Sequence, residues 1–70
     1  MPLSMANMGA AFSVSQIHGK DETRRFLENL GFVSGAMVTV ITETQGNLIV
    51  SVKDTRVAIS KAMASKIHVA

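Results

Sequence analysis

Residues 37–53 read MVTVITETQGNLIVSVK, and this stretch decides the class of fold. Apolar residues alternate with other residues on both sides of a short polar loop, which is typical of two half-buried strands. Both apolar sets face one core if position 38 pairs with 52, 40 with 50 and 42 with 48. This register leaves a three-residue loop, 44–46, that ends at Gly46, where a left-handed residue is common. The sequence therefore predicts a hairpin with strands 37–43 and 47–53.

The segment before the hairpin, residues 21–30 (DETRRFLENL), is typical of a helix. Apolar or small side chains recur at i, i+3, i+4 and i+7, at Thr23, Phe26, Leu27 and Leu30. We expect Asp21 to be the N-cap and Gly31 to end the helix in the left-handed conformation. Phe32 then makes the apolar contact that accompanies a Schellman motif. Gly35, which tolerates positive φ, completes the turn into the hairpin.

The outer segments predict three more short strands. Residues 11–17 (AFSVSQI) alternate, with a bulge near Gln16 where the alternation breaks. A tight turn at Asp54-Thr55 leads to a strand around 57–59, one helical turn at 60–65 and a last strand at 66–69. Residues 1–8 are expected to be flexible or to form a short turn packed on the barrel. The fold class is thus mainly β, a small barrel of about five short strands with one α-helix between the first two, because closure removes exposed edges.

Length and composition agree with one small domain over residues 1–70. Hydrophobic residues make up 47% of the chain, and the net charge is +2. The absence of cysteine excludes disulfides and thiolate chemistry. No apolar run approaches a membrane span or a signal peptide, so a cytosolic protein is expected. A chain this short has little material with which to wall a catalytic pocket, so an enzyme is not expected.

Two motifs at this spacing resemble the FeoA family, the small accessory proteins of bacterial ferrous iron uptake. The first is Arg-Phe-Leu-x-x-Leu-Gly-Phe-Val-x-Gly, which ends at Gly35. The second, Gly-Asn-Leu-Ile-Val-x-Val-Lys-x-Thr-Arg-Val-Ala-Ile-Ser, spans residues 46–60. Ser34 and Asp54 depart from the residues that many members carry there, but both keep turn chemistry.

The resemblance implies an SH3-like barrel in the cytosol without catalytic activity or cofactor. It also implies that the chain modulates transport by binding the cytosolic part of a FeoB-type permease, and so meets the membrane only through that partner. Two alternatives stay open. One is an SH3-like module that binds peptide or nucleic acid, and the other is an iron-linked regulatory module. The oligomeric state does not follow from the sequence.

The candidate metal ligands are weak. His18 and His68 are the only imidazoles, and a transition-metal site needs three or four ligands in fixed geometry. The five methionines are scattered, which is typical of flexible packing. No bound metal is therefore expected.

Nucleic acid is not expected as a partner. Single-strand binders stack bases on exposed aromatic residues, and this chain has no Trp or Tyr. Phe12 and Phe26 are expected on core faces. Arg24 is expected to pair with Glu28 on a solvated helix face.

The hairpin register suggests a contact surface. It sends Met37, Ile41, Ile49 and Ser51 outward, with Ile41 opposite Ile49. Paired isoleucines on an outer face are unusual unless something covers them. Either the N-terminal residues Leu3 and Met5 cover them, or Met37, Ile41 and Ile49 belong to the patch that docks on the permease.

Overall fold

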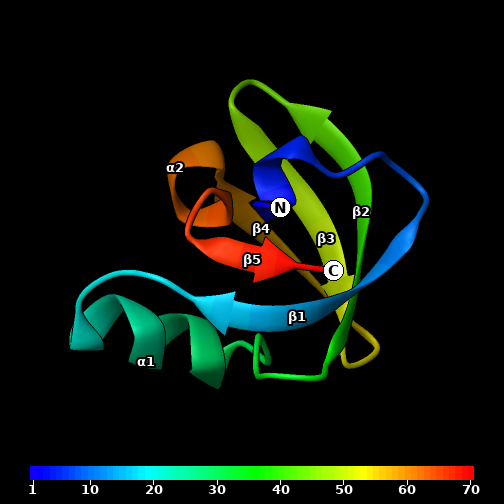
Figure 1. Ribbon diagram of the computed structural model, residues 1–70. Helices are drawn as coiled ribbons and strands as arrows, with labels where there is room; N and C mark the ends of the chain where they lie inside the picture. Colours follow the sequence, from blue (N-terminus) through cyan, green and yellow to red (C-terminus); the bar gives the residue numbers. More distant parts are fainter.

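The computed structural model describes residues 1–70, which form one twisted, strongly curved antiparallel sheet with short helices at its margins (Figure 1). The strand order is β4-β3-β2-β1-β5. The elements along the chain are η1 (Leu3–Met5), β1 (Ala11–Ile17), α1 (Asp21–Asn29), β2 (Met37–Thr44), β3 (Asn47–Val52), β4 (Thr55–Ser60), α2 (Lys61–Ala64) and β5 (Ile67–Val69). The predicted mainly-β fold, with five strands and one helix between the first two, is confirmed.

The core lies inside the curved sheet and is wholly apolar. No polar or charged residue is buried, and no buried side-chain nitrogen or oxygen lacks a hydrogen-bond partner. The sheet supplies most of the thirteen core side chains, which are Leu3, Val14, Leu27, Phe32, Val38, Val40, Leu48, Val50, Val52, Ile59, Ala64, Ile67 and Val69. Helix α1 adds only Leu27.

The central hairpin has the predicted register over half its length. Val38 pairs with Val52 and Val40 with Val50, as expected. The predicted pairing of positions 42 and 48 is wrong, because a bulge at Ile41 shifts the register and Thr42 pairs with Ile49. The loop is accordingly two residues long, Gln45-Gly46, with φ angles of 47° and 81°. Both positive φ values fit the turn type that matches strand twist in two-residue hairpins.

The start of α1 differs from the prediction. Lys20 is the N-cap residue and makes no side-chain cap hydrogen bond, whereas Asp21 is already helical. The Asp21 carboxylate instead accepts a hydrogen bond of 2.7 Å from Arg24. The predicted pair of Arg24 with Glu28 is therefore wrong. Asp21 still favours the helix, because a negative charge in the first turn opposes the helix dipole.

The end of α1 is the predicted Schellman motif. Gly31 has φ of +113°, and its N–H donates to the carbonyl of Glu28 at 3.0 Å. The N–H of Phe32 donates to the carbonyl of Leu27 at 3.1 Å, and the Phe32 ring is fully buried. This stop ties the helix directly to the core. Gly35, with φ of +87°, makes the turn that follows.

The first residues of the chain form the short 3-10 helix η1. Leu3 in η1 is fully buried, and η1 packs against α2 and β5. The N–H of Val69 donates to the carbonyl of Met1 at 2.7 Å, and Pro2 bridges to His68, so the terminus extends the sheet beyond β5. The N–H of Gly9 donates to the carbonyl of Val40 at 2.8 Å. None of the helices has the length and apolar character needed to cross a membrane.

Candidate functional site

The outer face of the β2–β3 hairpin carries the residues that the sequence singled out. Met37 is 56% exposed. Ile41 and Ile49 are half-buried, and neither belongs to the partly buried hydrophobic residues that pack against the core. Ile41 does not pair with Ile49 as predicted. It lies in the bulge, where two residues of β2 oppose Ile49, so the two isoleucines remain neighbours on this side.

This outer face is uncharged at its centre. Residues paired directly across an antiparallel sheet share a face, so Thr39 lies beside Ser51 and Ile49 beside Ala58. Charges lie at the margin of the face, where Arg56 pairs with Ser51 on one side and Lys53 and Asp54 follow Ser51 and Val52 at one end. We call the set Met37, Thr39, Ile41, Ile49 and Ser51 the outer face.

One end of the outer face is hollowed. An open depression of about 340 Å³ is lined by Ala36, Met37, Thr39, Ser51, Lys53 and Asp54. The last two residues form a tight turn between β3 and β4, with positive φ at both. The exposed thioether of Met37 therefore lies beside a depression with one cation and one anion at its margin.

The chain's own N-terminus does not cover the isoleucines in the way the sequence suggested. Leu3 lies in the core, and Met5 is 71% exposed. Neither residue screens the outer face, so that alternative is wrong. Ile41 and Ile49 are half-buried, and Met37 is the mostly exposed apolar residue of this face.

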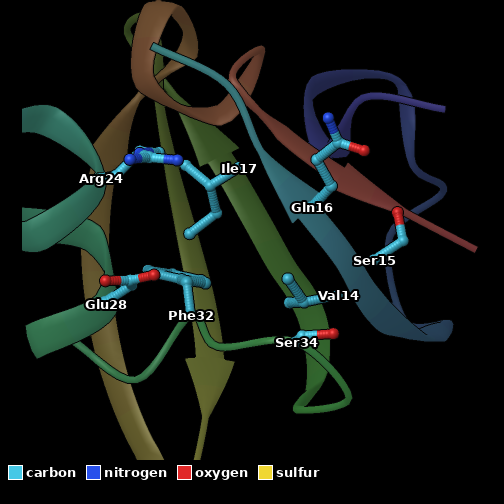
Figure 2. A pocket seen from close by; sticks show the side chains of 8 residues that line it. All are labelled: Val14, Ser15, Gln16, Ile17, Arg24, Glu28, Phe32 and Ser34. Carbon is cyan, nitrogen blue, oxygen red and sulfur yellow. The ribbon is translucent and has the colours of Figure 1, made fainter. Parts of the chain in front are cut away.

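A second concave surface, which the sequence did not indicate, lies between α1 and β1. It measures about 440 Å³ (Figure 2). Figure 2 shows Arg24, Glu28 and Phe32 on one side of it and Val14 and Ile17 on the other. Its polar lining residues are Ser15, Gln16, Arg24, Glu28 and Ser34, and none of them is a histidine, cysteine or lysine. This groove exists because α1 touches the barrel mainly at its C-terminal end.

The predicted position of Phe26 is wrong. The helical pattern put it on the core face, but it is 51% exposed, and Leu27 is the one buried residue of α1. A nine-residue helix that meets the barrel near one end buries a narrower stripe than its apolar pattern suggests. The argument against nucleic-acid binding that placed Phe26 in the core is therefore wrong. A single exposed aromatic side chain still does not provide the several stacking surfaces that single-strand binders use.

The two histidines, fifty residues apart in sequence, are in contact. Their ring centroids are 4.2 Å apart, with the planes at 68°. Desolvation lowers the pKa of His68, and the nearby His18 and the Met1 ammonium lower it further. No third histidine, cysteine, aspartate or glutamate joins them to form a set that could hold a metal ion.

Comparisons with known proteins place the chain in a family. The sequence matches the FeoA domain family over residues 1–70. A crystal structure of an iron uptake regulatory protein, FeoA, is 35% identical, with a TM-score of 0.89, and the match covers 99% of this chain and 92% of that chain. Among curated proteins, no sequence matches this chain.

Two further structures extend the comparison. FeoA of Stenotrophomonas maltophilia, solved with zinc and described as a procaryotic SH3 domain protein, is 29% identical with a TM-score of 0.88. That match covers 100% of this chain and 89% of that chain. FeoA of Chlorobium tepidum is 25% identical with a TM-score of 0.90, over 99% of this chain and 68% of that chain. The curved five-stranded sheet is thus an SH3-like barrel.

Proposed function

This chain belongs to the FeoA family, and from that membership we propose that it is an accessory component of ferrous iron uptake that acts in the cytosol. Its partner is the cytosolic part of a FeoB-type permease, and its effect on transport comes through protein–protein contact. The likeness to an iron uptake regulatory protein supports the role in iron uptake.

The outer face is the proposed docking surface for the permease. The observation that carries this proposal is the pair Ile41 and Ile49, which are half-buried and lie outside the core cluster, beside the mostly exposed Met37. The centres of protein interfaces are depleted in charged residues and enriched in methionine, and the outer face has both properties. Met37 has three rotatable bonds and a polarisable sulfur, so it adapts to the shape of a partner.

The charges at the margin have a separate role in this proposal. Arg56 and Lys53 flank an uncharged centre, and marginal charges mainly affect the rate and orientation of encounter. The apolar centre then sets how long the complex lasts. No covalent step is involved.

A matched pair of substitutions tests the proposal. Met37→Glu places a carboxylate on the outer face, and Met5→Glu places the same group on η1, where Met5 is also mostly exposed. We expect Met37→Glu to weaken capture of detergent-solubilised permease by about tenfold or more and Met5→Glu to leave it unchanged. Equal capture by both variants and the unaltered chain would show that the permease binds elsewhere.

Ile49→Asp separates docking from internal packing. If Ile49 is a docking residue, this substitution changes the free energy of unfolding by at most about 0.5 kcal/mol while capture of the permease falls. Urea unfolding followed by circular dichroism measures the first quantity. A loss of about 2 kcal/mol or more would make Ile49 a packing residue and remove it from the proposed surface.

A further inference from the structure

The His18–His68 contact lies across the seam where β5 joins the sheet. Gln16 of β1 pairs with His68 of β5, and His18 follows two positions later, so both imidazoles extend on the same side. The N–H of His18 donates to the carbonyl of Lys66 at 2.8 Å, which fixes the end of β1 beside the start of β5. At 4.2 Å between ring centroids, the two rings pack edge to face.

Neither histidine takes part in an ion pair. The two ion pairs of the molecule join Arg24 to Asp21 and Lys61 to Glu43, and neither includes a histidine. The charges that act on His68 are those of His18 and the Met1 ammonium. The Met1 ammonium faces His68, and the Lys66 side chain lies over Gly19, next to His18. Ser15 donates to the carbonyl of His68 and carries no charge. A proton on either imidazole therefore adds positive charge where positive charge is already concentrated.

We propose that the His18–His68 pair makes the β1–β5 seam sensitive to pH. The neutral His68 ring packs against His18 and closes the seam, and the seam loosens as the pH falls and His68 takes up a proton. The seam is short, because β5 has three residues and a bulge interrupts its pairing with β1 between Val14 and Gln16. A change of charge on His68, whose ring contacts His18, thus acts on one of the least extensive pairings in the sheet.

The direction of the effect follows from linkage. Folding lowers the pKa of His68 below its ordinary value of 6.5, so the opened seam binds the proton more readily than the closed seam. The closed seam is therefore fully stabilised only at a pH above 6.5, the ordinary pKa of histidine. This stabilisation is lost as the pH falls from 6.5 through the lower pKa that His68 has in the folded protein. Each unit of difference between the two pKa values raises the population of the opened seam by about tenfold at pH below both.

Amide hydrogen exchange and imidazole titration by NMR test the proposal in the full chain. On lowering the pH from about 7.5 to about 5, the protection of the Ile67 and Val69 amides should fall by about threefold or more, relative to Val50 in β3 and after correction for intrinsic exchange. His18→Gln removes one imidazole at an exposed position. This variant should raise the pKa of His68 and reduce the fall in protection. His68→Gln, the matched variant, should abolish the fall.

Two results would overturn the proposal. One is a His68 pKa that is the same with His18 and with Gln at position 18, because the rings would then not interact. The other is a relative protection of β5 that does not change with pH in the unaltered chain. If His68→Gln disturbs the seam at every pH, the His68 pKa in His18→Gln still decides the outcome.

Discussion

The β2–β3 hairpin supplies five of the core side chains, Val38, Val40, Leu48, Val50 and Val52, whereas α1 supplies Leu27 alone. The hairpin is bound to neighbouring strands on both sides, with β1 beside β2 and β4 beside β3. Helix α1 is held at its C-terminal end by the Schellman motif and the buried Phe32, and it leaves a groove along β1 (Figure 2). The barrel therefore carries the stability of the domain, and the helix is an appendage that opens at lower cost.

A pair of identical substitutions measures this difference most directly. Leu48→Ala removes a core side chain from the hairpin, and we expect a loss of about 3–5 kcal/mol in the free energy of unfolding. Leu27→Ala should cost less, about 2 kcal/mol, because the loss cannot exceed the free energy that docks α1 on a barrel that stays folded. Urea unfolding gives both values.

Hydrogen exchange then separates local from global opening. In Leu27→Ala the amides of α1 should lose protection while the amides of β3 largely keep theirs. If both sets of amides lose protection equally, α1 and the hairpin unfold as one cooperative unit. That result would contradict the inference that α1 opens at a lower free-energy cost than the barrel.

The second substitution test concerns Gly31, at the boundary between helix α1 and the barrel. Gly31→Val should destabilise the chain by about 1–3 kcal/mol, because φ of +113° is strained for a β-branched residue. A Cβ there would lie 3.4 Å from the Lys53 Cδ and 3.6 Å from the Val52 Cγ1, ordinary contact distances, so most of the cost is backbone strain. Thermal and urea unfolding measure it. Gly31→Asn, which tolerates positive φ better, should cost less; equal costs would contradict the strain explanation.

The local parts of the fold were predictable because they depend on neighbouring residues. The helix stop at Gly31 and Phe32 and the pairing of Val40 with Val50 both follow from spacing alone. The bulge at Ile41 was not predictable, because Thr42 and Glu43 are polar in either register and Gln45 gives no sign of its positive φ. A single inserted residue therefore changed the loop from three residues to two.

The candidate sites also differ in how far the local sequence predicts them. Met37, Ile41 and Ile49 could be placed on the outer face from strand alternation, although not their direct pairing. The contact of His18 with His68 depends on β5 returning to β1 across fifty residues, and the α1–β1 groove depends on how the helix docks. Neither leaves a pattern in the local sequence.

Phe26 offers the last and smallest test of the comparison. If α1 packed as its apolar pattern suggests, Phe26→Gln would remove a core aromatic side chain at a cost of about 3 kcal/mol or more. Because the ring is 51% exposed and Leu27 alone is buried, we expect the free energy of unfolding to change by about 0.5 kcal/mol or less. Gln keeps helix propensity close to that of good helix formers, so the substitution isolates the contact of the ring. Urea unfolding decides between the two values, and a loss near the larger one would mean that α1 closes onto the barrel in solution and fills the groove beside β1.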